Sequence, residues 1–382
     1  MKAISLIISL ALLLGLSAGK ANAITCDARY VIDNGVSLTV KPINIDYEWD
    51  NANVECALEF ATQENIPLVQ LVAGRYAFER SVEVNGFEGT LRGKGMWEKT
   101  IINGELDFIG GSPTIEHLQI ETDRGALAGI LAVQDSDNCD RPMFVSLNRV
   151  AVVGYRGRMG FGMGSVEECD MPLKGSLSIN RSDITGGDEA LVLSGLGSGA
   201  RISLTNNDLN GNNEGAVCIL SMSNQIAFSA LANSCRFTSY SLVVLGDDRL
   251  SRSDFYLRAN TLGFSGHEGK FEIQDYGQRL NVHLEDNRVG TTWIGMTDLP
   301  GSGRNITFNA LNNKLNSLED DCLRVVGAQS VIAGNECDVA AGRTPTYDLW
   351  LQDTDGSTVN QPNWLSVHPS PNKNLLSNAG LY

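Results

Sequence analysis

Six asparagines recur at almost even spacing through the second half of this sequence, each after a short run in which apolar and polar residues alternate. Successive members lie 26, 27, 27, 26 and 22 residues apart: Asn207, Asn233, Asn260, Asn287, Asn313 and Asn335. A fixed period of this length is typical of proteins that stack one structural unit on the next. An asparagine at the same turn of every unit can bond its amide to those above and below, so we expect a stacked amide column.

A second apolar alternation lies between the asparagines. Its inward pairs are Leu191/Leu193, Val217/Ile219, Leu242/Val244, Phe271/Ile273, Ile294/Met296 and Leu323/Val325. Each repeat therefore holds two or three short strands and has no room for a crossover helix of about ten residues. The pattern predicts an all-β chain whose single strand path winds into a parallel β-solenoid.

The first 23 residues differ from the rest. Lys2 is followed by a continuous apolar run and by a small-residue cleavage pattern at Ala21 and Ala23, which predicts a signal peptide over 1–23. No other stretch reaches the roughly 18 apolar residues that a membrane span needs. We therefore expect a periplasmic or secreted protein without membrane insertion. The period ends near residue 341, which suggests a β-helix over 24–344 and a C-terminal cap or strap over 345–382.

Eight cysteines follow the predicted signal peptide: Cys26, Cys56, Cys139, Cys169, Cys218, Cys235, Cys322 and Cys337. An even number in an exported chain favours disulfides, and pairing in sequence order would close four bridges. No C-x-x-C pair accompanies them, which argues against zinc. Cys235 and Cys337 fall at inward strand positions. Cys218 and Cys322 fall at outward ones, so strand alternation opposes the last two pairings.

The formal net charge of −16 limits the possible partners. So acidic a surface repels nucleic acid and anionic lipid, and no basic run offsets it. The same charge disfavours unaided binding of a polyanionic polysaccharide. The acidity also has a simpler interpretation, which is that it keeps an exported protein soluble.

A helix is predicted ahead of the repeats, over residues 54–64. Apolar residues of this segment fall on one helical stripe, and Asn51 or Asn53 can cap its start. Asn65 and Pro67 end it. Such a helix would cover the open apolar end of the solenoid, which would otherwise be an aggregation edge.

Two segments after this helix carry a family resemblance: VQLVAGRYAFERSVEVN at 69–85 and GTLRGKGMWEKTIING at 89–104. Together with the asparagine repeat, they resemble the opening coils and the asparagine-bearing turn of the pectate-lyase-like right-handed parallel β-helix superfamily. The resemblance covers 54–340. It implies a single-stranded right-handed parallel β-helix with an N-terminal capping helix. It also implies a polysaccharide as partner, in a superfamily of lyases, hydrolases, epimerases, tailspikes and proteins with no known reaction.

Acidic residues recur at the same positions when the repeats are aligned on the inward apolar pairs given above, so we expect them to stack in columns along the solenoid. The positions three and two residues before the first inward residue hold Asp188, Glu189, Glu214, Glu268, Asp320 and Asp321. The outward column two residues further on reads Val192, Cys218, Val243, Glu272, Gly295 and Arg324. Glycoside hydrolysis needs one protonated and one ionised carboxyl group. The predicted catalytic carboxyl groups are therefore those of Asp188, Glu189, Glu214, Glu268, Asp320 and Asp321. A motif resemblance, given next, adds His267 as a predicted catalytic residue.

Two of these segments are similar to polygalacturonase motifs. EDDCLRV at 319–325 resembles the aspartate strand of that family, and GHEGKFEI at 266–273 resembles its histidine motif, although the two occur here in the opposite order. Tyr240 is a predicted sugar-stacking residue. Lys270 and Arg324 are predicted to bind the substrate.

Two alternatives remain open from the sequence. A lyase of this superfamily would use Lys270 or Arg324 as base and calcium to neutralise a uronate, with oxygen ligands from Glu268, Glu272, Asp320 and Asp321. Alternatively, the chain is a non-catalytic surface, adhesive or envelope structural β-helix protein. In that case the acidic columns are solvated turns, because turn positions favour aspartate for backbone reasons alone.

Overall fold

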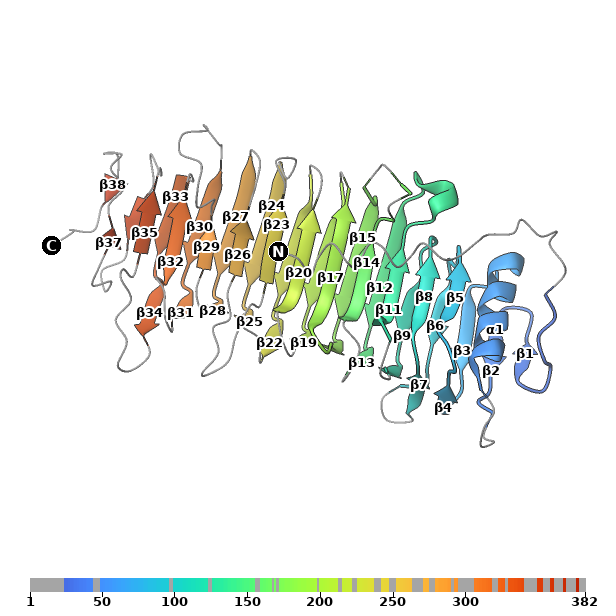
Figure 1. Cartoon of the computed structure of the whole chain (residues 1–382). Helices are drawn as coiled ribbons and strands as arrows, with labels where there is room; N and C mark the ends of the chain where they lie inside the picture. Colours follow the sequence, from blue (N-terminus) through green and yellow to red (C-terminus); the bar gives the residue numbers. More distant parts are fainter. Residues whose placement is uncertain are drawn as a thin grey trace.

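The computed structural model shows one long coil whose strands stack into three sheets (Figure 1). The all-β prediction is confirmed, with a single α-helix near the N-terminus of the described chain. The structure describes residues 24–43, 49–95, 99–122, 126–154, 159–166, 168–169, 172–197, 199–211, 215–221, 225–236, 242–246, 252–262, 271–274, 279–289, 292–294, 306–317, 322–326, 329–339, 349–352, 358–360, 367–368 and 376–377.

Each coil places one strand in sheet C, then one in sheet A, then one in sheet B. Sheet A contains β1 (Val31–Asp33), β2 (Leu38–Val40), β3 (Leu68–Leu71), β6 (Thr90–Arg92), β9 (Thr114–Glu116), β12 (Met143–Asn148), β15 (Gly175–Asn180), β18 (Arg201–Thr205), β21 (Ala227–Leu231), β24 (Ser253–Arg258), β27 (Leu280–Glu285), β30 (Thr307–Leu311), β33 (Gln329–Ala333), β36 (Thr358–Asn360) and β38 (Leu376–Ser377). Sheet B contains β4 (Gly74–Ala77), β7 (Thr100–Asn103), β10 (Gln119–Glu121), β13 (Ala151–Val153), β16 (Asp183–Thr185), β19 (Asp208–Asn210), β22 (Ser234–Arg236), β25 (Thr261–Leu262), β28 (Arg288–Val289), β31 (Lys314–Ser317) and β34 (Glu336–Val339). Sheet C contains β5 (Val82–Asn85), β8 (Leu106–Ile109), β11 (Ala128–Val133), β14 (Met159–Gly164), β17 (Glu189–Leu196), β20 (Gly215–Ser221), β23 (Leu242–Gly246), β26 (Phe271–Gln274), β29 (Thr292–Ile294), β32 (Leu323–Val326), β35 (Leu349–Gln352) and β37 (Val367–His368).

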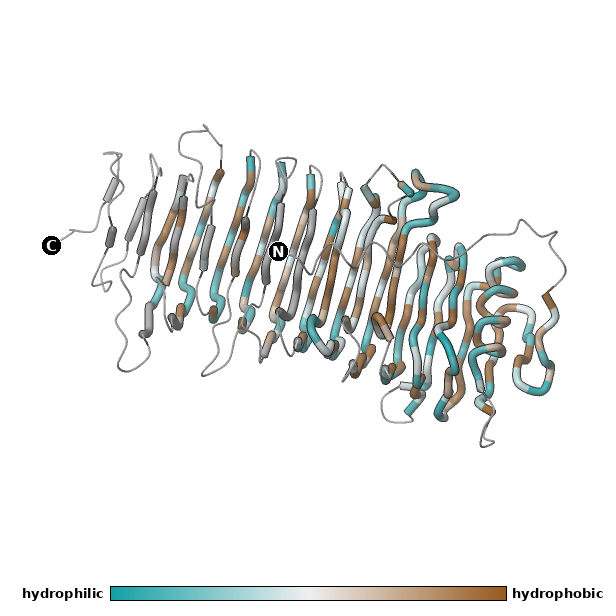
Figure 2. The backbone as a smooth tube through the Cα atoms, viewed as in Figure 1, coloured by the Kyte–Doolittle hydropathy of each residue, from teal (hydrophilic) through white to brown (hydrophobic). Residues whose placement is uncertain are grey.

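Strands of consecutive coils pair in parallel, so residues one repeat apart lie side by side in a column. Apolar and polar residues alternate along the strands (Figure 2), and the apolar set is buried inside the coil. The central inward column of sheet A is fully buried and reads Ile202, Phe228, Phe255, Val282 and Phe308. Removing such a phenylalanine from water stabilises the fold by roughly 1.5–3 kcal/mol, so the core is a continuous rod of stacked apolar rows.

The six repeating asparagines stand in one buried column at the turn between sheets A and B. The Nδ2 of each donates to the Oδ1 of the next at 2.8–3.0 Å. The same Nδ2 also donates to a backbone carbonyl of the preceding coil, as Asn233 does to Leu204 at 2.9 Å. The column starts at Ser182, whose backbone N–H donates to Asn207 Oδ1 at 2.9 Å. The Nδ2 group of each of the first five asparagines, from Asn207 to Asn313, therefore donates two hydrogen bonds away from water.

Helix α1 (Asn51–Glu64) lies at the N-terminal end of the coil and packs on β2, β3 and β5 (Figure 1). It buries the predicted stripe, including Val54, Leu58 and Ala61, so the capping helix is confirmed. Asn65 ends it in the left-handed conformation with a φ of 55°. No helix of the described chain is long and apolar enough to cross a membrane.

The N-cap of α1 differs from the prediction. It is Asp50 and not Asn51 or Asn53, and its side chain makes no capping bond. The buried Asp50 carboxylate instead accepts the backbone N–H groups of Ile43 at 2.6 Å and Ala77 at 2.9 Å. Asp50 therefore ties the segment before the helix to sheet B, a long-range role that local sequence cannot indicate.

Two of the predicted disulfides are present, Cys26–Cys56 and Cys139–Cys169. The expectation of four sequential bridges is wrong at Cys235, which is a buried free thiol. Cys235 lies in sheet B, in register with the buried Leu209 and Leu262, whereas Cys218 lies in sheet C. Cys322 is disulfide-bonded, and the side chains of Cys218 and Cys337 lie outside the described residues.

The sheets extend past residue 344, where the sequence suggested that the coil would end. Strand β35 pairs in parallel with β32 of sheet C, and β36 pairs in parallel with β33 of sheet A. Strands β37 and β38 then follow β35 and β36 in the same two sheets. The segment predicted to be a cap or strap therefore contributes strands to the coil.

Candidate functional site

Asp188 and Glu189 are the two predicted catalytic residues whose side chains the structure describes. They lie at the start of β17 in sheet C and both are partly buried. The other predicted catalytic and sugar-binding residues lie outside the described chain: Glu214, Tyr240, His267, Glu268, Lys270, Asp320 and Asp321. Glu272 and Arg324 are described by their backbone alone, in β26 and β32.

The backbone register of sheet C corrects the predicted outward column. Glu272 pairs with Trp293, and Trp293 pairs with Arg324, so the column contains Trp293 and not Gly295. Trp350 follows Arg324 one coil later. The predicted alignment is two residues out in this coil, because Thr292 and Ile294 of β29 pair with Phe271 and Ile273, where the sequence predicted Ile294 and Met296.

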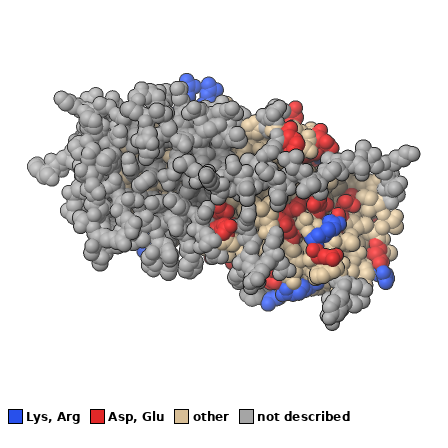
Figure 3. Space-filling view, viewed as in Figure 1, with Lys and Arg blue, Asp and Glu red and all other residues tan. Residues whose placement is uncertain are grey.

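A carboxyl cluster that the sequence analysis missed lies at the start of sheet C. Glu83 on β5 is in register with Asp107 on the neighbouring strand β8, about 4.8 Å away along the coil. Glu105 directly precedes β8, and all three side chains are partly buried. Acidic side chains gather over these N-terminal coils on the face that contains β5 and β8 (Figure 3). We call Glu83, Glu105 and Asp107 the carboxyl cluster.

The pKa of Asp107 is raised to about 8. Burial of the carboxyl is the largest cause, the nearby Glu105 and Glu83 add to it, and a hydrogen bond with Ser81 opposes it. One oxygen of Asp107, Oδ1, is buried and has no hydrogen-bond partner in the described chain. Asp107 therefore carries a proton at neutral pH next to a second carboxyl group on the adjoining strand.

Glu105 has a different position in the cluster. Its two carboxylate oxygens accept the backbone N–H groups of Ala128 at 2.9 Å and Leu127 at 3.3 Å, at the start of β11. Burial raises the pKa of Glu105, and these two bonds oppose the rise. Glu105 thus fixes the start of the next coil and adds negative potential beside Asp107.

Apolar residues follow the carboxyl cluster along the same face of sheet C. Leu131 is in register with Asp107, and Gly162 and Val192 continue the column. Ala128 and Met159 pack with them into a small buried group. A Cβ on Gly162 would lie 2.9 Å from Leu131 Cδ1, so the glycine leaves room for that leucine. This apolar stretch separates the carboxyl cluster from Glu189 by three strands, about 14 Å.

The predicted calcium site is not described, because Glu268, Asp320 and Asp321 lie outside the described residues. Within the described chain, no group of three or more acidic, histidine or cysteine side chains is arranged to hold a metal ion.

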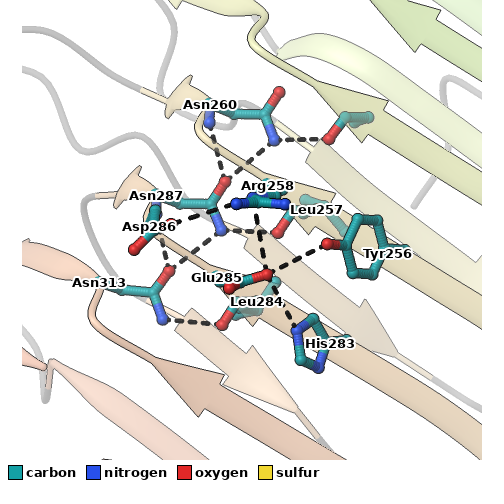
Figure 4. A network of polar contacts seen from close by, with 11 residues as sticks. Tyr256, Leu257, Arg258, Asn260, His283, Leu284, Glu285, Asp286, Asn287 and Asn313 are labelled. Carbon is teal, nitrogen blue, oxygen red and sulfur yellow. Dashed lines mark hydrogen bonds and ion pairs between the residues drawn. The ribbon is translucent and has the colours of Figure 1, made fainter. Parts of the chain in front are cut away.

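A second polar cluster lies on the outer face of sheet A, on β24 and β27 (Figure 4). The Tyr256 hydroxyl donates to Glu285 Oε2 at 3.1 Å, and the Tyr256 ring stacks on His283 with centroids 5.0 Å apart. Arg258 Nε lies 3.6 Å from Glu285 Oε2 and 3.9 Å from the carboxylate of Asp286. All these residues are partly or fully exposed, so the cluster is a surface network built from cross-strand pairs.

The sequence contained a signal for the carboxyl cluster. In SVEVN and ELDFI, Glu83 and Asp107 occupy the outward positions of two strands that lie one short coil apart. The asparagine period begins only at residue 207, so it did not place these earlier coils in register. The proton on Asp107 depends on burial, which no local pattern reveals.

Comparison with known proteins shows likeness in structure only. The sequence matches no protein-family model. No curated protein matches it by sequence either. The A-module of the mannuronan C-5 epimerase AlgE4 from Azotobacter vinelandii superposes with a TM-score of 0.55 at 14% identity, over 89% of this chain and 96% of that chain. The AlgE6 A-module from the same organism gives a TM-score of 0.50 at 14% identity, over 89% and 94%. This chain therefore has a right-handed parallel β-helix fold, which it shares with these two A-modules.

Proposed function

We propose that this protein binds a polysaccharide along the outer face of sheet C and hydrolyses it with Asp107 and Glu83. The main support is the protonated Asp107 carboxyl, which lies beside a second carboxyl group one strand away. Glycoside hydrolysis uses such a pair, one group as acid and the other as base or nucleophile. The A-modules of similar fold are named for an activity on mannuronan, which supports a polysaccharide as the class of ligand.

The cleavage step uses Asp107 as the acid and Glu83 as its partner. Asp107 donates its proton to the glycosidic oxygen as the bond from that oxygen to the anomeric carbon breaks. The Glu83 carboxylate, on the paired strand about 4.8 Å away, bonds to the anomeric carbon as the leaving oxygen takes the proton. A water molecule then gives its proton to Asp107 while its oxygen displaces Glu83 from the anomeric carbon, so each product chain ends in a new hydroxyl group and both carboxyl groups are restored. Glu105 does not exchange protons in this scheme and keeps β11 in position.

The rest of the outer face of sheet C would bind the part of the polysaccharide that extends beyond the cleaved bond. Asp188 and Glu189 lie three coils from the carboxyl cluster, beyond the apolar stretch. Further along, the register places Glu272, Trp293 and Arg324 in one column of the same sheet. Tryptophan and arginine are suited to hold sugar rings and their hydroxyls. We assign these residues to binding, and the two described disulfides support action outside the cytoplasm.

The test is product release from a panel of neutral and acidic polysaccharides, measured as new reducing ends. Asp107→Asn and Glu83→Gln keep the size of each side chain and remove its carboxyl group. We expect each to lower the rate by about 10² to 10⁴. Asp254→Asn on sheet A is the matched control, because it removes an exposed carboxylate from another face of the coil.

Two results would contradict the proposal. The first is full activity in Asp107→Asn, which would move the chemistry to another part of the face. The second is the absence of product with every polysaccharide, which would favour the non-catalytic structural β-helix. A rate that falls as the pH rises through about 8 would identify Asp107 as the acid, because its proton is lost there.

A further inference from the structure

Tyr256 is held in one orientation on the outer face of sheet A. Its ring stacks on His283 with planes 10° apart, and its hydroxyl donates to Glu285 at 3.1 Å. Both partners belong to β27, so the ring is supported from one side (Figure 4). An aromatic ring fixed in this way loses little conformational entropy when a ligand packs on its other face.

The other face of the Tyr256 ring points toward β21. Ser229 occupies the register position next to Tyr256 on that strand, with Ala227 and Leu231 on either side of it. These three side chains are smaller than tyrosine, so the free face of the ring borders a shallow surface that Ala227, Ser229 and Leu231 form. We call this surface the floor. Tyr256 is 37% exposed and Leu231 is 40% exposed. An aromatic face and an apolar side chain thus border the hydroxyl of Ser229.

Serine hydroxyls continue this floor away from Tyr256. Ser203, Ser178 and Ser146 follow Ser229 in the same outward column, one on each preceding coil. Within the described chain, Ser203 and Ser229 form no side-chain hydrogen bond. A hydroxyl group can both donate and accept, so this row offers partners to a ligand rich in hydroxyls.

The described charges around Tyr256 are mixed, although the whole chain carries −16: Arg201 and Arg258 lie among Asp254, Glu285 and Asp286. Arg258 lies against Glu285, and the Asp254 carboxylate accepts a hydrogen bond from Asn281 at 2.7 Å. Arg201 and Asp254 are two strands apart in one column. Because charges of both signs lie close together, the electrostatic potential over this face is weak. The face therefore suits an uncharged ligand.

We propose that this face binds one sugar unit of a neutral polysaccharide, with the apolar face of the sugar ring on Tyr256 and its hydroxyls on Ser229 and Ser203. Sites of this kind combine an apolar surface with a few polar groups that set orientation. The site lies on sheet A, whereas the carboxyl cluster lies on sheet C, so it anchors the polysaccharide away from the cleavage step. The inference rests on the proposed function only for the class of ligand.

Affinity electrophoresis of the full chain in gels that contain soluble neutral glucans tests this site. Tyr256→Ala should weaken retardation by about tenfold, because it removes the stacking face. Tyr256→Phe keeps the ring and its stacking partner, and should stay within about twofold of the original. Ser229→Leu fills the floor and should reduce binding as Tyr256→Ala does.

Phe144→Ala is the matched control. Phe144 is a 52% exposed aromatic residue on the same outer face, four strands from Tyr256, and its removal should leave retardation unchanged. Equal retardation of Tyr256→Ala and the original chain, or an equal loss in Phe144→Ala, would overturn the inference, as would the absence of retardation by any neutral glucan. The reducing-end assay with Asp107→Asn decides the proposed hydrolysis separately, so either proposal can fail while the other stands.

Discussion

Asn260 donates hydrogen bonds from both its Nδ2 and its backbone N–H to Oδ1 of Asn287, each at 2.9 Å. One side-chain oxygen thus satisfies two buried donors of the preceding coil. The same geometry is repeated by the pairs on either side of it, so each coil fixes the turn of its neighbour.

Replacing Asn260 with alanine should destabilise the fold by roughly 2–4 kcal/mol, because the backbone and side-chain N–H groups of Asn233 lose their acceptor in a buried site. Urea denaturation measures the effect. Asn281→Ala is the control, since Asn281 bonds Asp254 on the exposed surface, and it should change the free energy of unfolding by less than about 0.5 kcal/mol. Equal stability of the two variants would show that the column is not a major source of stability.

Ala259→Gly should raise the free energy of unfolding by roughly 0.5–1 kcal/mol. Ala259 is exposed and has a φ of 55°, a left-handed conformation that strains a residue with a Cβ. Ala227→Gly is the matched control, because Ala227 is exposed on an extended strand, where glycine should lower stability by roughly the same amount. A loss of stability in both variants would contradict the strain at Ala259.

Asp107 should make the protein less stable as the pH rises from about 4 to about 8. The carboxyl ionises in the unfolded chain near its ordinary pKa of 3.8, whereas in the folded protein its pKa is about 8. Folding therefore takes up a proton in this window, and the stability that the protonated form provides is lost as the pH increases. Asp107→Asn should flatten this dependence and be roughly 1–3 kcal/mol more stable than the original at pH 8. Parallel pH curves for the two proteins would refute the raised pKa.

Loss of the Cys139–Cys169 disulfide, through the double change to serine, should lower the free energy of unfolding by about 2–4 kcal/mol. The bridge closes a loop with a sequence separation of 30 and so restricts the unfolded chain. Denaturation of the oxidised protein measures the change. Cys235→Val is the control, because Cys235 is a buried free thiol and valine preserves an apolar side chain there. If Cys235→Val lowered the free energy of unfolding more than the double change, the disulfide would not be the larger source of stability, which would contradict the prediction.

The cap of α1 and the column around Trp293 show where local reasoning stops. The apolar stripe over 54–64 predicts the helix, since helical spacing is a property of neighbouring residues. The choice of Asp50 as N-cap follows instead from contacts with Ile43 and Ala77, which come from other parts of the fold. The predicted alignment is two residues off at Trp293, because a shift of two residues along a strand as short as β29 leaves its alternation unchanged.

The sequence by itself determined the winding of this chain. A recurring asparagine and a period-two apolar pattern can both be satisfied at once only when each repeat stacks on the last, so the fold follows from spacing. Tertiary structure alone decided the chemistry of its surface. Glu83 and Asp107 become neighbours, Asp107 keeps its proton and Tyr256 gains a rigid orientation only after the coils stack, because desolvation and cross-strand contact depend on residues that are distant in sequence.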